Sequence, residues 1–374
     1  MSAFLTKIIT NFGHIFKLSI LTDNQNTMKT LKSLVIVALA AVMLFGCKSA
    51  PKEEKIPVGV QLYSVRDNME QDFYGTLKAI KEMGYDGVEF AGLFGNTPEQ
   101  VKAWCDELEL NPISAHVPLA DMMADIDGVI KTYKAIGCQY LAVPYLPEEL
   151  RPGTDQFEPT VAAIAELAKK VKAAGMTLLY HNHDFEFKTL EDGSYGLDYI
   201  YSTVPADLLQ TELDLCWVKY SGIDPAEYLR KYTDRSPVVH FKDYYFEGEK
   251  EGDPYALIGI EKEEEAPKTV FEFRPLGCGM QDVQSLIDAF KDAHSKWIIV
   301  EQDNPSMGMC PMASIKKGLC NLKHMLCPGE CEQKECCDKQ EGCCEKEEGC
   351  CEKKEGCCDN AEGCEKSCCQ EKAE

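Results

Sequence analysis

The sequence TLLYHNHDFEF at residues 177–187 joins an apolar run to two histidines and several acidic or amide side chains. Side chains alternate along a β-strand, so His181 and His183 would share one face while Tyr180 and Asn182 would share the other. An apolar strand with a polar, metal-competent carboxyl end is typical of a barrel strand that opens into an active site. The alternative is two solvent-exposed histidines in a loop, and the rest of the chain decides between them.

Outward from this stretch, residues 56–327 alternate short apolar runs with amphipathic segments. The sequence TPEQ at 97–100 supplies a capping threonine, a proline for the first turn and a glutamine that completes a capping box, which predicts a helix start. An irregular insert at residues 246–274 interrupts the alternation, and we interpret it as a lid or rim loop. Strands are predicted at residues 57–65, 86–90, 112–118, 140–146, 177–187, 209–218, 236–244 and 296–303.

Eight strand–helix units over residues 56–327 predict an α/β fold with a single (β/α)8 TIM barrel. A doubly wound open sheet has the same alternation and is the alternative. Polar side chains near the carboxyl ends of the strands favour the barrel, because only a closed ring brings so many strand ends to one point. These side chains are Gln61, Glu89, His116, His181, His183, Asp214, His240, Lys242 and Glu301.

Histidines are concentrated at these strand ends, which hold His116, His181, His183 and His240 out of 7 in the chain. Four residues on consecutive strands form a mixed nitrogen and oxygen ligand set that suits a divalent ion such as Mn, Zn, Co or Mg. The alternative is a set of satisfied polar groups at the barrel rim. The proposed ligands are His181, Asp214, His240 and Glu301.

Seven motifs stand out along the chain: GVQLYSVRD at 59–67, GYDGVEF at 84–90, SAHVP at 114–118, YHNHDFEF at 180–187, ELDLCWV at 212–218, VVHFKDY at 238–244 and VEQD at 300–303. With these motifs the chain resembles the sugar phosphate isomerase/epimerase family of xylose isomerase-like barrels, which includes inosose dehydratase. The resemblance places metal ligands at Asp214, His240 and Glu301. Many members have a glutamate on strand five, where this chain has His181 or, as the alternative, His183, as in the inosose dehydratase and keto-sugar lyase branch.

The chemistry that the resemblance implies is removal of a proton next to the carbonyl of a sugar or keto-sugar. A bound metal would stabilise the enediolate, which then isomerises, epimerises or expels a β-leaving group. The expected base is His183 or Glu301, since an imidazole starts near neutral pKa. Lys242 is expected to bind oxygens or counter charge. The expected substrate-binding residues are Gln61, Tyr63, Glu89, His116, Trp217 and Arg274, although for Lys242, Arg274 and Trp217 a rim salt bridge or packing is an equal alternative.

The N-terminal region resembles a bacterial lipoprotein signal at residues 28–47. Lys29 and Lys32 give a positive start, an apolar segment too short to span as a mature helix follows, and the sequence LFGC ends at Cys47, the predicted lipidation site. Residues 1–27 are then interpreted as a non-native upstream extension, and residues 48–55 as a tether. The expected location is the cell envelope, with the membrane reached only through the lipid. A plain secretory signal or an anchor helix is the alternative.

The C-terminal region, residues 328–374, repeats paired cysteines every seven residues between Glu and Lys. Glycines and adjacent cysteines make a poor coiled-coil seam, so we expect a disordered tail. Paired thiols at this density can bind soft metals such as Zn or Cu(I), or form disulfides in an oxidising envelope. A low-complexity extension without a metal is the other interpretation.

A formal net charge of −23 argues against a nucleic-acid partner, which needs a basic face. Part of this charge is local, since residues 330–374 hold 15 acids against 7 lysines. The related apurinic endonuclease barrel would need more histidines and a basic surface. The remaining rival is a lipoprotein that binds sugar or metal without catalysis.

Overall fold

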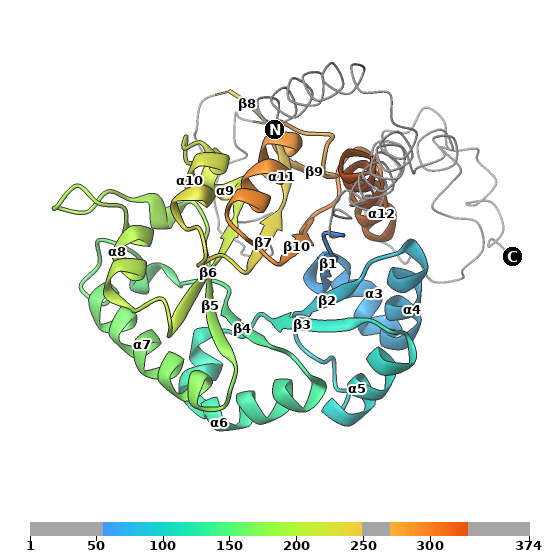
Figure 1. Ribbon diagram of the computed structural model, residues 1–374, viewed down its shortest axis with the longest axis horizontal. Coiled ribbons are helices and arrows are strands. Elements are labelled where there is room, and N and C mark those ends of the chain that lie inside the picture. The colour runs from blue at the N-terminus through green and yellow to red at the C-terminus, as the bar shows by residue number, and fades with distance from the viewer. Residues whose placement is uncertain (1–54, 249–269, 328–374) are drawn as a thin grey trace, which may run out of the picture. The chain divides into compact units, whose positions relative to one another are not determined.

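The computed structural model describes residues 55–248 and 270–327 (Figure 1). Several sequence-based interpretations lie outside the described residues. They are the upstream extension at 1–27, the signal at 28–47 with Cys47, the tether up to residue 54, the middle of the insert at 249–269 and the cysteine-rich tail at 328–374.

Eight parallel strands form the centre of the fold in the order β3-β2-β1-β10-β7-β6-β5-β4. This is the order of consecutive strands around a ring that is opened between β3 and β4, with β10 as the eighth barrel strand. The strands are β1 (Val58–Gln61), β2 (Gly87–Phe90), β3 (Asn111–Ala115), β4 (Tyr140–Val143), β5 (Thr177–His181), β6 (Leu209–Asp214), β7 (Val238–Phe241) and β10 (Trp297–Val300).

The ring closes between β3 and β4 through few backbone contacts. A parallel bridge joins His116 to Ala142, and the Val117 N–H donates to the Ala142 carbonyl at 3.0 Å. The Gln139 N–H donates to the Ile113 carbonyl at 3.1 Å, which continues the seam. The predicted TIM barrel is therefore confirmed as a nearly closed ring of eight parallel strands, and the open-sheet alternative is wrong.

Helices surround the strands on the outside of the ring (Figure 1). The capping box predicted at Thr97 and Gln100 is present at the start of α5. Gly84 ends α4 with a φ of 94°, a left-handed conformation that favours glycine. The helices are α3 (Arg66–Gln71), α4 (Phe73–Met83), α5 (Pro98–Glu107), α6 (Leu119–Ile136), α7 (Phe157–Ala173), α8 (Gly196–Thr203), α9 (Leu215–Tyr220), α10 (Pro225–Lys231), α11 (Val283–Asp292) and α12 (Pro311–Leu326), with short 3-10 turns η1 (Leu62–Val65), η2 (Glu148–Leu150) and η3 (Phe185–Phe187).

A small apolar cluster fills the barrel interior below the polar strand ends. Leu179, Val238 and Ile299 each precede by two positions a polar residue on the same strand face. Ile113 reaches over Gly59, where a Cβ atom would lie 2.5 Å from its Cδ1, so the glycine makes room for the isoleucine. The larger core lies between the strands and the helices. The apolar cluster thus provides a packed floor for the residues that follow.

All eight predicted strands are shorter than the sequence pattern suggested, and three of them show how a strand ends. The run at 209–218 changes from β6 to α9 at Asp214, whose side chain accepts the Cys216 N–H at 2.8 Å and caps the helix. The run at 57–65 turns into η1 after Gln61, and the run at 236–244 breaks after Phe241. The backbone leaves β1 and β6 at the polar residue that ends each strand, and it leaves β7 at Phe241, directly before Lys242.

The ends of the predicted irregular insert are regular. β8 (Asp243–Glu247) and β9 (Val270–Arg274) pair as an antiparallel ribbon. Asp243 holds the base of this ribbon, since its carboxylate accepts the backbone N–H groups of Gly277, Gly279 and Gln281 at 2.9–3.0 Å. The irregular-loop prediction is therefore wrong for these ends.

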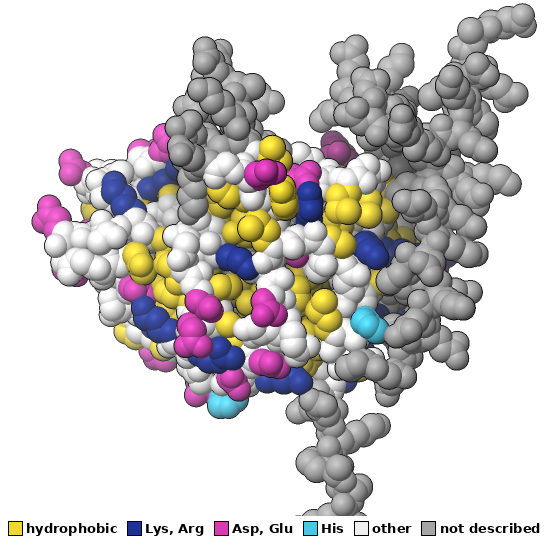
Figure 2. Space-filling model, turned by 90° about the horizontal axis from the view of Figure 1, so that it is seen from above, with side chains coloured by type: hydrophobic (Ala, Val, Ile, Leu, Met, Phe, Trp, Pro, Cys, Tyr) yellow, Lys and Arg dark blue, Asp and Glu magenta, His cyan; other side chains and the backbone are white. Residues whose placement is uncertain are grey.

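The surface carries mixed charge. On the face shown in Figure 2, acidic, basic and hydrophobic side chains are interspersed. Within residues 55–248 and 270–327, every helix is too short or too polar to cross a bilayer.

Candidate functional site

Four predicted ligands lie together at the carboxyl ends of their strands. His181 ends β5, Asp214 ends β6, His240 lies on β7 and Glu301 directly follows β10. One ligand atom from each of the four lies within 4.8 Å of the others, and all four residues are buried. We call this group the metal centre. It contains His181 and not His183, which answers the choice that the sequence left open on strand five.

The residues of the metal centre fit a divalent cation. Asp214 Oδ2 is buried and accepts no hydrogen bond from any described residue. An unpaired buried carboxylate oxygen is costly, and a cation is the partner that would satisfy it. His181 Nε2 lies 3.8 Å from this oxygen, and His240 Nδ1 lies 3.0 Å from Glu301 Oε2. Imidazole nitrogens beside carboxylate oxygens form the donor set that zinc and manganese accept.

Lys242 is the cation that the chain itself contributes to this region. Its ammonium lies 3.2 Å from Glu301 Oε2 and 3.6 Å from Asp214 Oδ2, and it donates a close hydrogen bond to Asp303. The aromatic rings of Phe273 and Trp217 cover it at 4.6 Å and 5.4 Å. Burial opposes its charge, yet the surrounding carboxylates raise the pKa of Lys242 well above its usual value. Lys242 is therefore a fixed positive charge beside the metal centre.

The two acids of the metal centre differ in their electrostatic surroundings. Burial raises the pKa of Asp214 to about 6, although Lys242 acts in the opposite direction. Burial would also raise the pKa of Glu301, but Lys242 and His240 hold it well below its usual value. Glu301 is thus already ionised and paired, whereas the charge on Asp214 is incompletely balanced.

A second polar group adjoins the metal centre, and we call Glu89, His116 and Glu212 the bridging network. His116 Nε2 lies 2.6 Å from Glu212 Oε2 and 3.1 Å from Glu89 Oε1. Burial disfavours charge on His116, but the two carboxylates raise its pKa to about 10. His240 Nε2 lies 2.7 Å from Glu89 Oε1, which connects the network to the metal centre.

Gln61, Glu89 and His116, which the sequence assigned to substrate binding, have partners inside the barrel. The Gln61 amide donates to Glu89 Oε1 at 2.6 Å, and the Ser114 hydroxyl donates a close hydrogen bond to Glu89 Oε2. Gln61 Oε1 accepts the Tyr63 N–H at 3.0 Å. Gln61 and Glu89 are fully buried, and their polar atoms are committed to one another. These side chains therefore organise the barrel interior, and their substrate-binding roles stay predictions.

His183 lies in an aromatic environment next to the metal centre. Its ring centroid is 5.3 Å from those of His181 and Trp217, and its plane stacks on Phe185. Burial, followed by the nearby Lys242, lowers the pKa of His183 well below its usual value. A neutral imidazole at this position can accept a proton without first losing one, but its lowered pKa makes it a weaker base than the near-neutral imidazole that the sequence predicted.

The remaining predicted substrate residues are distributed differently. Tyr63 is half-buried at the mouth, where burial raises its pKa and Asp303 and Glu301 add to the effect. Trp217 lies on α9, not on a strand as predicted, and packs flat against Phe271 as well as over Lys242. These contacts fit the packing interpretation of Trp217, which the sequence left open beside substrate binding.

Arg274 lies on β9, where its guanidinium pairs with Glu272 and sits 4.1 Å from the Tyr245 ring centroid. The structure therefore favours the salt-bridge interpretation of Arg274 over the oxygen-binding role.

Sequence reasoning missed three buried acids. Glu212 lies two residues before Asp214 and so shares its inward face of β6, and Asp303 lies two residues after Glu301. This two-residue spacing was the signal that could have found both. Glu186 accepts the Tyr180 hydroxyl at 2.7 Å and the His183 N–H at 2.8 Å, and so fixes the turn after β5. Its only signal was its place in the opening motif.

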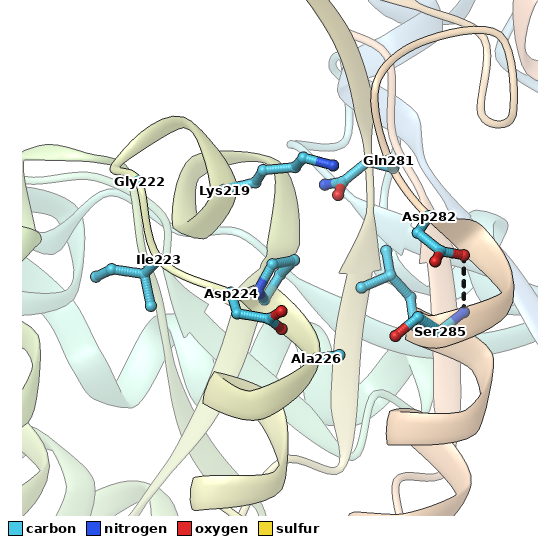
Figure 3. Close-up of a pocket in the computed structure, with 10 residues that line it drawn as sticks. Lys219, Gly222, Ile223, Asp224, Ala226, Gln281, Asp282 and Ser285 are labelled. Carbon is cyan, nitrogen blue, oxygen red and sulfur yellow. Dashed lines mark hydrogen bonds between the residues drawn. The ribbon is translucent and has the colours of Figure 1, made fainter.

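A separate cavity of about 340 Å³ lies outside the barrel between α10 and α11 (Figure 3). Its charged lining residues already have structural roles. Asp224 and Asp282 cap α10 and α11, and the Lys219 ammonium donates to the Met280 carbonyl. This cavity therefore does not compete with the metal centre as a candidate active site.

Known proteins share this fold and part of this sequence. An inosose dehydratase of Geobacillus kaustophilus is 26% identical over 199 residues, which cover 47% of this chain and 63% of that protein. An inosose dehydratase of Lacticaseibacillus casei is 25% identical over 150 residues, covering 40% of this chain and 48% of that protein. The matched part thus spans less than two thirds of these relatives.

Solved structures resemble the chain at lower identity. A sugar phosphate isomerase/epimerase from Parabacteroides distasonis superposes with a TM-score of 0.57 at 20% identity, covering 75% of this chain and 98% of that one. The IolI protein with a bound zinc atom gives 0.55 at 16%, covering 72% and 98%. An L-ribulose 3-epimerase gives 0.54 at 15%, covering 73% and 95%. These likenesses show a shared fold.

A family model described as the xylose isomerase-like TIM barrel matches residues 77–323. That range contains the strands from β2 to β10 and the four residues of the metal centre. The chain belongs to the xylose isomerase-like TIM barrel family.

Proposed function

We propose that the chain is a divalent-metal-dependent enzyme that removes a proton next to the carbonyl of a sugar or keto-sugar. The observation that carries this proposal is the metal centre, in which His181, Asp214, His240 and Glu301 converge and Asp214 Oδ2 accepts no hydrogen bond from the described residues. Similar proteins include an inosose dehydratase and an L-ribulose 3-epimerase, and the structure of the IolI protein is described with a bound zinc atom. Mn, Zn, Co or Mg would suit this donor set.

His183 is the better candidate for the base that accepts the proton. Glu301 is already bound to His240 and Lys242, whereas His183 is neutral and lies beside His181. A bound divalent cation would stabilise the negative charge that develops on the substrate oxygens. Lys242, held by Asp303 and Glu301, supplies a second positive charge at the same mouth. Together they lower the barrier to removing a weakly acidic C–H proton.

Isomerisation or epimerisation returns the proton to carbon, whereas β-elimination expels a leaving group instead. Two observations favour the dehydratase outcome as the second candidate. The curated relatives quoted above are named inosose dehydratases, and strand five carries His181 where many isomerases of the resemblance carry a glutamate. A symmetric pair of glutamates, one for each face of the substrate, is therefore missing from this part of the barrel.

The proposed function is tested by exchange and by metal content together. The full chain and its Asp214→Asn, His240→Ala double variant would be incubated in heavy water with keto-sugars and aldose/ketose pairs. We expect deuterium in the recovered sugar or a dehydrated product, and about one more metal ion per chain in the wild type than in the variant. The difference cancels any metal held by tail cysteines. Equal exchange by both proteins would instead support a sugar- or metal-binding lipoprotein without catalysis.

We also propose that the enzyme is exported and held at the cell envelope by a lipid on Cys47. The basis is the order of Lys29, the apolar segment and the LFGC sequence. An exported enzyme would meet sugars released from polysaccharides more readily than sugar phosphates. Labelled palmitate should enter the wild-type chain and not a Cys47→Ser variant, which should leave the membrane fraction. Metal binding by the tail at 328–374 stays a separate prediction.

A further inference from the structure

Every carboxyl group of the bridging network reaches an imidazole ring. Glu89 contacts His116 and His240, and Glu212 contacts His116 and His181. Glu89 and Glu212 have no exposed surface, and the side chain of His116 is only 10% exposed. Burying two carboxyl groups inside a barrel is costly, so their contacts with the metal-centre histidines call for a role.

His240 contacts the metal centre with one ring nitrogen and the bridging network with the other. Its Nδ1 lies 3.0 Å from Glu301 Oε2 in the metal centre, and its Nε2 lies 2.7 Å from Glu89 Oε1 in the bridging network. An imidazole that binds a cation through one nitrogen carries its remaining proton on the other. Carboxylates lie at hydrogen-bond distance from both nitrogens, but Glu301 belongs to the metal centre and would itself face a cation, so Glu89 is the carboxylate left to hold the proton on Nε2. Nδ1 is then the nitrogen with a lone pair for a cation.

His181 faces the two groups with its nitrogens exchanged, but through charge and not through a hydrogen bond. Its Nδ1 lies 3.3 Å from Glu212 Oε2 without hydrogen-bonding to any described residue, and its Nε2 lies 3.8 Å from Asp214 Oδ2. The negative charge of Glu212 favours a proton on Nδ1, which leaves Nε2 to face the cation. The two glutamates thus select opposite ring nitrogens in the two histidines.

His116 holds the two glutamates in place for both tasks. Its Nε2 lies between Glu89 and Glu212, and its ring stacks on His240 at an interplanar angle of 6°. Glu89 is further fixed by Gln61 and Ser114. The network is therefore a preassembled frame, and its positive His116 offsets part of the two negative charges.

We propose that Glu89, His116 and Glu212 are positioning residues that select the cation-binding nitrogens, Nδ1 of His240 and Nε2 of His181. This inference rests on the proposed metal centre. It assigns to the network a role in metal affinity and geometry, and no contact with the substrate. Partners of this kind on metal-bound histidines contribute about 10- to 100-fold to metal affinity.

The first experiment measures Mn²⁺ affinity of the full chain from the electron paramagnetic resonance signal of free Mn²⁺. Manganese binds thiols weakly, so the tail cysteines contribute little. We expect Glu89→Ala and Glu212→Ala each to weaken binding by about 10- to 100-fold. Glu89→Gln and Glu212→Gln, which keep one acceptor oxygen, should regain most of that loss. Unchanged affinity in folded alanine variants would overturn the inference while leaving the metal centre intact.

The matched control is Glu186→Gln. The buried Glu186 carboxyl group accepts hydrogen bonds from the Tyr180 hydroxyl and the His183 backbone N–H, and from no imidazole ring among the described residues. This variant should bind Mn²⁺ as the wild type does. A loss as large as that of Glu89→Ala would show that any buried glutamate has this effect, and would also overturn the inference.

The second experiment stays decisive if the alanine variants fail to fold. Nitrogen-15 spectra of the histidine-labelled, Zn²⁺-loaded wild type report which ring nitrogen is protonated and which binds zinc. We expect His240 bound through Nδ1 and His181 bound through Nε2, each with the other nitrogen protonated. The reverse pattern would overturn the inference. If neither ring shifts when zinc is added, the metal centre and hence the proposed function fail instead.

Discussion

The bridging network and the metal centre contain similar side chains but balance their charges differently. In the network, His116 lies between Glu89 and Glu212, and the pKa of His116 is raised to about 10. In the metal centre, Lys242 pairs with Glu301 and Asp303 at 3.2 Å or closer but remains 3.6 Å from Asp214 Oδ2. The network is therefore balanced by His116, and the metal centre is balanced in part by Lys242 and by His240, whose pKa burial would lower but nearby carboxylates raise well above its usual value. Asp214 Oδ2 still accepts no hydrogen bond from any described residue, so an external cation would fit best beside that oxygen.

Glu186 shows a third way in which this barrel accommodates a buried carboxyl group. Glu186 is fully buried and accepts hydrogen bonds from neutral groups, and burial raises its pKa to about 8. Glu89 and Glu212 are thus paired with an imidazole, Asp214 is open to a cation, and Glu186 is protonated below its raised pKa. Each solution predicts a different response to substitution.

The largest effect is expected from Asp214→Asn, which removes the charge of the incompletely paired carboxylate. Asn keeps an oxygen that can cap α9, so the fold should persist. Loss of several kcal/mol of charge stabilisation corresponds to a fall of about 10³-fold or more in kcat/KM. Steady-state kinetics with the substrate found by exchange, together with metal content, measure it.

The matched control for this substitution is Asp224→Asn, which changes the capping residue of α10 far from the barrel mouth. Its kinetics should equal those of the wild type. Full activity of Asp214→Asn without bound metal would contradict the assigned role of the metal centre.

The next effect is a pH dependence of stability that Glu186 introduces. Its folded pKa of about 8 lies above the usual value of 4.5, so the folded state holds a proton that the unfolded state has lost between these values. Stability is therefore greatest below pH 4.5 for this group and falls as pH rises towards 8. Each pKa unit is worth about 1.4 kcal/mol, which amounts to a few kcal/mol in total.

Urea unfolding of the wild type and Glu186→Gln across pH 4.5–8 isolates this contribution. The amide reproduces the protonated acid, with its NH₂ towards Tyr180 and its oxygen towards the His183 N–H. The difference in unfolding free energy between the two proteins should move in favour of Glu186→Gln as pH rises. A constant difference would mean that Glu186 is ionised in the folded state.

A smaller effect is expected from adding metal to the protein. A cation that binds the folded state alone at 100 times its Kd raises the unfolding free energy by about 2.7 kcal/mol. Mn²⁺ should stabilise the wild type by this amount in urea unfolding and should not stabilise Asp214→Asn. Equal stabilisation of both proteins would place the cation elsewhere and would remove the contrast between the two polar groups.

The sequence predicted the ring and the convergence of the metal centre because strand ends in a barrel must meet. His181, Asp214, His240 and Glu301 each end or follow an apolar run, and the structure brings them together. The apolar residues after Asp214 suggested a longer strand, yet the capping bond to Cys216 starts α9 there. Strand periodicity predicts that a residue faces the barrel interior. It does not predict which other inward-facing residues that side chain will contact.

The bridging network illustrates that limit. Glu89 and His116 were found at strand ends but were assigned to a substrate, because their partner Glu212 lies inside a strand and was overlooked. The distances between His116 and the two glutamates depend on how β2, β3 and β6 approach across the barrel. Nothing local in the sequence determines those distances.

The smallest effect is expected from Ser114→Ala, which removes one donor to Glu89 Oε2. Leaving a buried acceptor with one fewer partner should lower the unfolding free energy by about 1–2 kcal/mol. Gln61, His116 and His240 still hold the other oxygen of Glu89 at 2.6–3.1 Å, so Mn²⁺ affinity should change by less than about 3-fold. Ser236→Ala, which removes a similar buried hydroxyl bonded to Thr211, is the control for stability alone. A 10-fold loss of affinity in Ser114→Ala but not in Ser236→Ala would show that Ser114, more than His116, fixes Glu89 against His240.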